Sequence, residues 1–332
     1  MIKYRVGVVG AGGIGNRHVS GLVALDHVEL VSVCDISEEA LNGFKKKWES
    51  TWSNISLYTN YTKMLTQENL DIVTVATPDN YHADPVVEAA NVGVKGIFCE
   101  KPMATTLIDA DRMLEAVDKN SCLLSIDHTR RFTSLWHHIK SEIIANGEIG
   151  ELQYITGTLS GRRASIFRNG THLIDALCYL ADSAPDWVFA ELETGYENYT
   201  EYRGDGGRDP KLEPSASGYI HFKNDVRAFY AGTSKNTAGP KWRFEIMGSQ
   251  AYIQIEKGAK IFRKDSIERI EPPKWEIEGI SAGARDLVLA LDENREVASP
   301  AKEALHVVEI IHGFLKSQQR GNTKIRLPLT RA

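Results

Sequence analysis

Short apolar runs alternate with amphipathic stretches along the first third of the chain. The amphipathic stretches 37–48 and 105–119 place apolar side chains at helical spacing, with Ser37 and Thr106 as candidate helix caps. Runs that are apolar on both faces are typical of parallel strands covered by helices on each side. The apolar runs are residues 5–9, 28–34, 72–76, 94–99 and 122–126. The alternation predicts a doubly wound α/β domain with a parallel sheet.

The pattern changes after residue 125, where strands follow one another more often. Residues 151–160, 217–223, 226–233, 242–248 and 251–256 read as strands, and 133–146, 171–181 and 301–318 read as amphipathic helices. Asn224-Asp225 fits a hairpin turn between two of these strands. Residues 197–215 carry few apolar side chains and are expected to form a long loop, of the kind that often binds or covers a ligand.

A glycine-rich turn follows the first predicted strand. Residues 10–15 read GAGGIG, which matches the G-x-G-x-x-G pattern of a dinucleotide-binding Rossmann domain. In that pattern Gly10 permits a tight turn, Gly12 lets the backbone approach a pyrophosphate, and Gly15 lets the helix pack close to the strand. The helix that begins there offers free N–H groups to the phosphates. The position between a strand and a helix makes dinucleotide binding the favoured interpretation.

An aspartate in the expected place indicates which dinucleotide binds. Asp35 lies at the end of the second predicted strand, about 20 residues beyond the glycines, where a carboxylate accepts hydrogen bonds from the ribose hydroxyls. The same carboxylate repels a 2′-phosphate, and Ile36 and Ser37 supply no arginine for one. We therefore expect NAD, with NADP less favoured.

Charge and cysteine usage narrow the class of protein. With 39 Lys and Arg against 44 Asp and Glu, the formal net charge of −5 argues against a general affinity for nucleic acid or anionic membranes. The four cysteines have no metal-binding or disulfide-framework spacing, which suits a reducing compartment. Met1 leads directly into a strand-like run, unlike a signal peptide, and no apolar run reaches the roughly 18 residues of a membrane helix. We expect a soluble, cytoplasmic protein.

Three further motifs give the chain a family resemblance. Residues 76–82 read ATPDNYH, residues 100–102 read EKP, and residues 129–132 read TRRF. Together with the glycine turn, they resemble the Gfo/Idh/MocA family, the group of glucose–fructose oxidoreductase and inositol dehydrogenase. The family has asparagine where this chain has Thr129. The resemblance extends over nearly the whole chain, through a GEIG stretch at 147–150 to a Leu327-Pro328 close.

The resemblance implies an architecture and an assembly. Residues 1–124 would form the dinucleotide-binding Rossmann domain. Residues 125–332 would form an α+β substrate-binding and oligomerisation domain, with an open, mostly antiparallel sheet that faces the first domain across a cleft. Relatives commonly pair through the exposed face of that sheet, which implies a homodimer or homotetramer.

The resemblance also implies the catalytic groups. Lys101, of the EKP stretch, corresponds to the family lysine that stabilises the developing alkoxide, and it follows a parallel strand at the edge where ligands bind. His172 lies in a stretch similar to the family's Asp-x-x-x-His-x-x-Asp and corresponds to the general acid/base. Asp175 completes that stretch and would partly compensate for the missing first aspartate, whose position is occupied by Arg168.

One position departs from the family pattern. The first aspartate of the His172 stretch is Arg168 in this chain, and an arginine accepts no proton. Several arginines fall in segments that the fold would place near the cleft. They favour a substrate with a carboxylate or phosphate, such as a sugar acid or nucleotide sugar. The candidate substrate-binding residues are Lys101, Arg131, Arg163, Arg168, His172 and Asp175.

The sequence thus predicts an NAD-dependent dehydrogenase acting on a secondary alcohol of a sugar, sugar acid or cyclic polyol. The candidate cofactor-binding residues are Gly10, Gly12, Gly13, Ile14, Gly15, Asp35, Thr77, Pro78, Asn80, His82, Glu100 and Lys101. No metal site is expected, since adjacent His137 and His138 do not face one ligand on a helix. Two alternatives stay open: a regulator that binds NAD(P) without turnover, and a lyase or hydrolase that uses NAD transiently.

Overall fold

The computed structural model describes residues 4–206 and 208–331 and divides into two compact units. The first unit contains the chain through Ala104, then Ile108–Phe132 and Glu276–Lys302. The second contains Thr105–Leu107, Thr133–Trp275 and the chain from Glu303 on. The division expected at residue 124 differs from this one, because residues 125–132 and a late segment, Glu276–Lys302, pack with the first unit.

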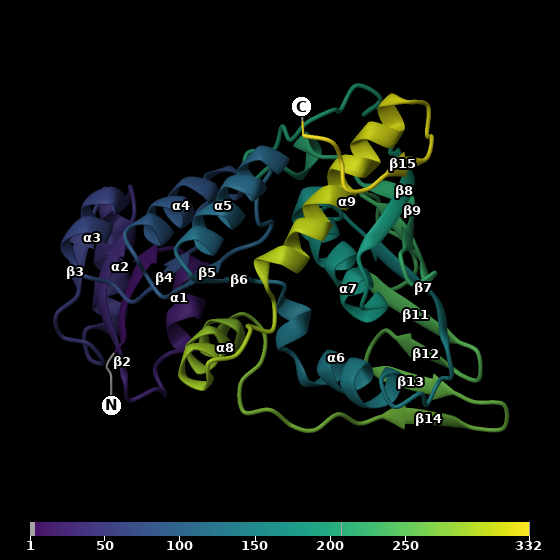
Figure 1. Ribbon diagram of the computed structural model, residues 1–332, viewed down its shortest axis with the longest axis horizontal. Helices are drawn as coiled ribbons and strands as arrows, with labels where there is room; N and C mark the ends of the chain where they lie inside the picture. The colour runs from purple at the N-terminus through teal and green to yellow at the C-terminus, as the bar shows by residue number, and fades with distance from the viewer. Residues whose placement is uncertain (1–3, 207, 332) are drawn as a thin grey trace. The chain divides into compact units, whose positions relative to one another are not determined.

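A parallel six-stranded sheet forms the centre of the first unit, in the order β3-β2-β1-β4-β5-β6 (Figure 1). Its strands are β1 (Tyr4–Val9), β2 (Val28–Cys34), β3 (Ser56–Tyr58), β4 (Ile72–Val75), β5 (Gly96–Cys99) and β6 (Leu123–Ile126). The five apolar runs of the sequence are confirmed as strands; β3, which is short and half-buried, was not expected. The strand order reverses between β1 and β4, and ligands of doubly wound sheets bind at the carboxyl ends of strands beside such a reversal.

Helices cover both faces of this sheet (Figure 1). The helices α1 (Gly13–Ser20), α2 (Glu38–Trp48) and α8 (Ile280–Glu293) lie on one face, and α3 (Tyr61–Gln67), α4 (Ala83–Asn91) and α5 (Leu107–Lys119) lie on the other. The expected cap of α2 is confirmed, since the Ser37 hydroxyl accepts a hydrogen bond from the N–H of Ala40 at 3.2 Å. Two acidic residues in the first turn of α2 and three lysines in its last complement the helix dipole.

The helix α8 joins the first unit although it follows most of the second in sequence. Leu287 packs under β5, where a Cβ on Gly96 would lie 3.0 Å from its side chain. Gly21, after α1, lies so close to α8 that a Cβ there would lie 1.9 Å from the carbonyl oxygen of Ser281. Ala284, Leu287 and Val288 belong to the same buried cluster as Val6 and Phe98. The late segment therefore completes one face of the nucleotide-binding sheet.

The second unit is built on a nine-stranded, mostly antiparallel sheet in the order β14-β13-β12-β11-β7-β10-β9-β8-β15. Its strands are β7 (Leu152–Ser160), β8 (Pro185–Leu192), β9 (Ala216–Phe222), β10 (Arg227–Thr233), β11 (Trp242–Gly248), β12 (Tyr252–Ile255), β13 (Ala259–Phe262), β14 (Ile267–Ile270) and β15 (Ile325–Arg326). Among the described strands of this sheet, β7 and β10 form a parallel pair and the other pairs are antiparallel. The expected α+β class is confirmed.

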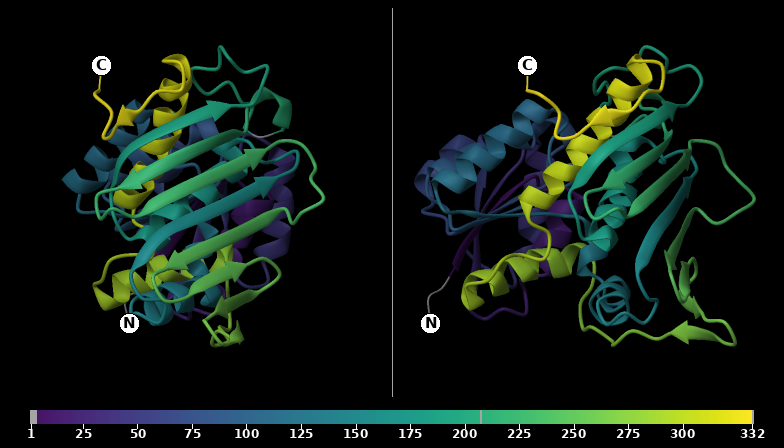
Figure 2. Two further views of the ribbon diagram at one scale, coloured as in Figure 1. Left: turned by 90° about the vertical axis from the view of Figure 1, so that its right-hand side faces the viewer. Right: turned by 45° about the vertical axis from the view of Figure 1, so that its right-hand side comes forward.

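Helices cover one face of this sheet, and its other face is seen directly in the left view of Figure 2. The covering helices are α6 (Ser134–His138), with its continuation Ile139–Ile144, α7 (Thr171–Ala181) and α9 (Ala301–Gln319). Close glycines let two of them approach: a Cβ on Gly157 would lie 2.6 Å from Leu173 of α7, and one on Gly218 would lie 2.6 Å from Phe314 of α9. The helix expected over 133–146 widens after α6, where the N–H of Ala145 bonds the carbonyl of Lys140.

Within residues 4–206 and 208–331, none of the helices combines the length and the apolar character that crossing a bilayer requires.

Candidate nucleotide and catalytic site

The glycine turn at the carboxyl end of β1 has the geometry that a pyrophosphate requires. Gly10 has φ +105°, and a Cβ there would lie 2.5 Å from the carbonyl oxygen of Ala76, while a Cβ on Gly15 would lie 1.9 Å from that of Gly10. Gly12 and Gly13 have nothing within 4 Å of a Cβ position, so the start of α1 presents bare backbone to open space. A phosphate group fits such a turn, because the N–H groups of the first helical turn point at it.

Asp35 follows β2 and ties the glycine turn to the second strand. Its Oδ2 accepts a hydrogen bond from the N–H of Ala11 at 2.8 Å, and its Oδ1 accepts one from the N–H of Ser37 at 2.9 Å. A carboxylate has about four lone-pair sites, so these two bonds leave acceptor capacity for ribose hydroxyls. The residue is therefore both a support of the turn and a suitable ribose acceptor.

The ATPDNYH segment leaves β4 and turns back toward the sheet edge. Thr77 donates its hydroxyl hydrogen to the carbonyl of Tyr81 at 3.0 Å, and Pro78 and Asn80 are exposed at the turn. His82, a candidate cofactor-binding residue, is buried in this edge of the sheet. Its Nδ1 lies 2.7 Å from the carbonyl oxygen of Pro102 and its Nε2 lies 2.9 Å from that of Thr77. His82 thus links the β4 loop to the EKP loop and acts as a support for both.

The EKP segment follows β5, whose neighbours in the sheet are β4 and β6. Lys101 is half-buried, and the peptide bond between it and Pro102 is cis. The backbone N–H of Lys101 donates to Oε2 of Glu100 at 3.2 Å. The lysine therefore lies at the same sheet edge as the glycine turn, with its own backbone fixed by the preceding carboxylate.

Two buried residues that the sequence analysis did not single out surround Glu100. His18, on α1, places Nε2 3.7 Å from Oε1 of Glu100 and packs its ring edge-on to Phe98. Asp127 follows β6, and one ligand-type atom from each of His18, Glu100 and Asp127 lies within 4.8 Å of the others. Two signals were present in the sequence: His18 comes three residues after the last motif glycine, and Asp127 directly follows a parallel strand.

The pKa values of the two carboxyl groups of this cluster are shifted in opposite directions. Burial alone would raise the pKa of Glu100, but the nearby His18 and the charge of Lys101 together lower it. Burial, then the charge of Glu100 and a hydrogen bond to it, raise the pKa of Asp127 well above its usual 3.8. Environments that separate two neighbouring pKa values are typical of functional sites.

The second unit holds the His172 stretch at the start of α7. His172 is half-buried, and Asp175, one turn further along the same helix surface, is 1% exposed. Arg168 lies in the turn before α7, where its Nη1 donates to the carbonyl of Gly206 at 2.9 Å. The arginine in the position of the family aspartate therefore holds the long loop that was expected over 197–215. Arg163 is exposed.

Arg131, a candidate substrate-binding residue, is buried. It lies in the first unit and is 3% exposed, and its Nη1 contacts the carbonyl of Ala298 at 3.5 Å. Such burial against the segment that follows α8 favours a structural role for Arg131.

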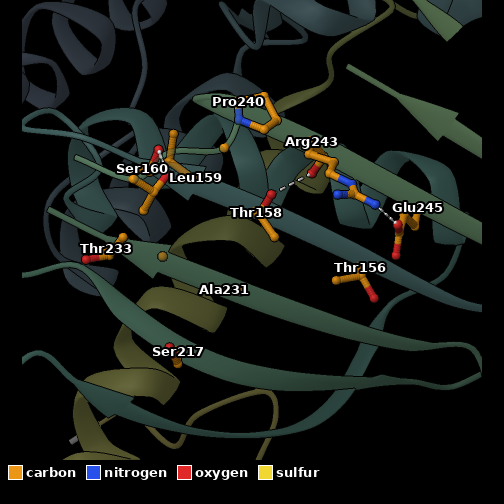
Figure 3. A pocket seen from close by; sticks show the side chains of 13 residues that line it. Thr156, Thr158, Leu159, Ser160, Ser217, Ala231, Thr233, Pro240, Arg243 and Glu245 are labelled. Atoms are coloured by element: carbon orange, nitrogen blue, oxygen red, sulfur yellow. Dashed lines mark hydrogen bonds and ion pairs between the residues drawn. The ribbon is translucent and has the colours of Figure 1, made fainter. Parts of the chain in front are cut away.

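A separate hollow of about 530 Å³ lies on the second unit's sheet (Figure 3). Thr156, Thr158 and Ser160 line it from β7, and Arg243 and Glu245 line it from β11. Because Gly157 faces α7, its neighbours Thr156 and Thr158 face the opposite side of the sheet. The hollow therefore belongs to the helix-free face, and none of the expected site residues lines it.

Comparison with known proteins places the chain in a class of oxidoreductases. Residues 4–128 match the family model described as oxidoreductase family, NAD-binding Rossmann fold, and residues 140–254 match the GFO/IDH/MocA C-terminal domain. The chain belongs to the Gfo/Idh/MocA family of NAD-binding oxidoreductases.

Individual relatives agree over most of the chain. Myo-inositol 2-dehydrogenase of Thermotoga maritima is 28% identical over 260 residues, covering 75% of this chain and 74% of the relative. The 4-carboxy-2-hydroxymuconate-6-semialdehyde dehydrogenase of a Sphingobium strain is 24% identical, with 92% of this chain and 96% of the relative covered. The WlbA dehydrogenase of Bordetella pertussis, solved with NADH and UDP-GlcNAcA, shares the fold at TM-score 0.78 and 21% identity, covering 99% of this chain and all of that one (100%).

Proposed function

We propose that this oxidoreductase transfers a hydride between NAD and a secondary alcohol of a sugar, sugar acid or cyclic polyol. The observation that carries the proposal is Lys101, which lies at the carboxyl end of β5, on the sheet edge where β1 presents its glycine turn. A fixed ammonium beside a dinucleotide site is the group that hydride transfer from an alcohol requires, because negative charge develops on the substrate oxygen.

The first unit supplies the groups to hold the cofactor. Gly10, Gly12 and Gly15 shape the turn for the pyrophosphate, Gly13 and Ile14 begin the helix above it, and Asp35 accepts from the ribose. Thr77, Pro78 and Asn80 border the same edge from β4, and Glu100 and Lys101 border it from β5. NAD, when bound there, supplies the hydride acceptor.

We assign the proton transfer to His172. Its imidazole is half-buried at the start of α7, and the buried Asp175 lies on the same helix surface one turn away. A general base must be able to accept a proton near neutral pH, and an imidazole suits this role. In this assignment Lys101 polarises the substrate oxygen and His172 removes the hydroxyl proton.

The arginines support an anionic substrate. Arg163 is exposed before α7, and Arg168 joins that segment to the long loop through Gly206. Two similar proteins point the same way. One is named for a substrate with a carboxyl group, 4-carboxy-2-hydroxymuconate-6-semialdehyde, and the other was solved with UDP-GlcNAcA, a sugar acid. We propose that this chain's substrate carries a carboxylate or a phosphate as well, held by Arg163 together with the loop that Arg168 anchors.

The test is a screen for NADH formation at 340 nm with polyols, neutral sugars, sugar acids and nucleotide sugars. We expect turnover with at least one anionic member, and a loss of at least about 100-fold in kcat for Lys101→Ala. Lys95→Ala is the matched control, because Lys95 is an exposed lysine of the same unit, paired with Asp71. Tight NAD binding without turnover on any panel member would contradict the proposal and favour a regulator.

The charge of the substrate is tested separately. Arg163→Ala should raise KM for the anionic substrate about tenfold or more, and much less for a neutral analogue. Arg162→Ala removes the neighbouring exposed arginine and serves as the control. Equal effects of Arg163→Ala on both substrates would contradict the anion-binding role.

We further propose a homo-oligomer in a reducing, cytoplasmic compartment. The helix-free face of the second unit's sheet carries Phe189 and Phe229, which are 42% and 39% exposed, in ring contact with Tyr219. An exposed aromatic surface of this kind is typical of an interface. All four cysteines are free and buried, which suits a reducing compartment.

A further inference from the structure

The cluster beside Lys101 contains two buried carboxyl groups, and an oxygen of one lies within 4.8 Å of an oxygen of the other. Oε1 of Glu100 and Oδ2 of Asp127 have no hydrogen-bond donor among the described residues, since Nε2 of His18, at 3.7 Å from Oε1, lies beyond hydrogen-bond distance. Both side chains are nearly inaccessible, at 8% and 1% exposed. Two ionised carboxylates at such separation in a buried site repel each other, and each unsatisfied oxygen is costly to bury.

One proton resolves both costs. If Asp127 is protonated, it becomes a donor and forms a hydrogen bond to the Glu100 carboxylate. The remaining oxygens already have other neighbours: Oδ1 of Asp127 lies 3.5 Å from the hydroxyl of Thr129, and Oε2 of Glu100 accepts the backbone N–H of Lys101. The pair then carries a single negative charge.

The surroundings match a pair of charge −1. The titratable groups acting on it are His18 from α1, and Lys101 and Cys99 at the end of β5. The Lys101 ammonium acts on both carboxyls and balances one negative charge. His18 is fully buried and lies nearest Glu100, so it closes the pair on the side of α1.

We propose that Glu100 and Asp127 share one proton and that the singly charged pair positions Lys101 at the sheet edge. Asp127 holds Glu100, and Glu100 holds the backbone and balances the charge of Lys101; both are positioning residues. The part of the inference that concerns Lys101 rests on the proposed function, whereas the shared proton does not.

The proton is measured first, in protein without cofactor. With aspartate ¹³C-labelled at its carboxyl carbon, infrared spectra at pH 7 should show the carbonyl stretch of a protonated aspartic acid. Asp127→Asn should remove that band. In Glu100→Gln the band should be lost at a lower pH than in the unaltered chain, because the neighbouring negative charge is gone. Asp71→Asn is the control, because Asp71 is ion-paired with Lys95 at 2.8 Å and its loss should leave the band in place.

Two results would overturn the shared proton. One is the absence of the band at pH 7, or its persistence in Asp127→Asn. The other is one equivalent of bound metal per chain by elemental analysis after purification without chelator, since His18, Glu100 and Asp127 would then be metal ligands.

Catalysis then tests the positioning of Lys101. Asn at position 127 still donates a hydrogen bond, so Asp127→Asn should keep kcat/KM within about threefold, whereas Asp127→Ala should lose about tenfold or more. Glu100→Gln removes the charge beside the ammonium, and the basic limb of the pH–rate profile should move down by about one pH unit. An unmoved limb would overturn the positioning role even where the band is present. Failure of the proposed dehydrogenase would be recognised differently, by no turnover in the unaltered chain with the infrared band intact.

Discussion

Single residues of the nucleotide site serve two purposes at once. Asp35 supports the glycine turn through Ala11, and we propose that it also accepts hydrogen bonds from a ribose. His82 could be recognised in the sequence as part of a motif, but not as a link between two loops. Its partner, the carbonyl of Pro102, is 20 residues away along the chain, and such a contact is invisible to local patterns.

The preference for NAD is expected to depend on the Asp35 carboxylate. Asp35→Ser should raise KM for NAD about tenfold or more, since hydrogen bonds to a charged acceptor are among the strong ones. It should also raise kcat/KM with NADP, because the repulsion of the 2′-phosphate is removed. Initial rates with both cofactors measure the ratio, and Asp26→Ser, an exposed change before β2, is the control. An unchanged ratio of NAD to NADP would contradict the role of Asp35.

Two glycines of the turn are expected to differ in what their loss affects. Gly15→Ala places a methyl group against the carbonyl of Gly10 and should lower the free energy of unfolding by about 1–3 kcal/mol. Gly13→Ala places one in open space, so it should leave stability within about 0.5 kcal/mol while weakening NAD binding. Thermal unfolding and NAD titration of both variants measure the difference. Equal stabilities would mean that the close approach at Gly15 relaxes without cost.

At the scale of secondary-structure elements, periodicity predicted most of what lies near the site. The strand expected at 28–34 and the helix expected at 171–181 are found in the structure with these same bounds, as β2 and α7. The short β3 and the alternating β8 were not anticipated, because three half-buried residues and a run with Asp186 and Glu191 give weak local signals. The cluster of His18, Glu100 and Asp127 was not anticipated either, since it joins a helix and two strands.

The helix α9 carries a histidine whose titration should affect stability. Nε2 of His312 lies 3.1 Å from the carbonyl of Thr105. Burial lowers the pKa of His312 below its usual 6.5, the bond to Thr105 opposes this, and the charge of Arg331 adds to the lowering. Below pH 6.5 the unfolded chain binds a proton there that the folded chain resists, so the free energy of unfolding should fall as the pH drops through this value.

The His312→Gln variant should lack that part of the pH dependence. Denaturant unfolding at pH 7.5 and pH 5.5 measures it, and the loss of stability between the two values should be smaller in the variant than in the unaltered chain. His137→Gln, which removes an exposed histidine of α6, is the matched control. A loss as large in His312→Gln as in the unaltered chain would contradict the assignment.

At the scale of the whole molecule, family motifs indicated the fold class and the cofactor, and the comparisons agree. The division into units was predicted less well, because nothing local in 276–302 shows that it packs with a sheet encoded more than 150 residues earlier. The substrate belongs to this scale too. Our proposal of an anionic substrate rests on arginines, and a contact such as that of Arg168 with Gly206 is made only in the folded loop.

The aromatic sheet face is expected to join copies of the chain. Phe189→Glu places a charge among stacked rings and should shift the protein to a smaller species in sedimentation or light scattering. Ile108→Glu alters an apolar residue on α5 that is even more exposed, and it should leave the mass unchanged. A monomeric unaltered chain would contradict the proposed oligomer.

The late arrival of α8 has a consequence for how the protein is made. When a ribosome has released the first 132 residues, six parallel strands are available but the apolar surface around Val6 and Phe98 lacks its cover. Nascent chains usually complete their amino-terminal domain first. Here α8 is complete only at Glu293, about 160 residues later, so the bare surface is exposed to chaperones and to other nascent chains while the second unit's sheet is being synthesised.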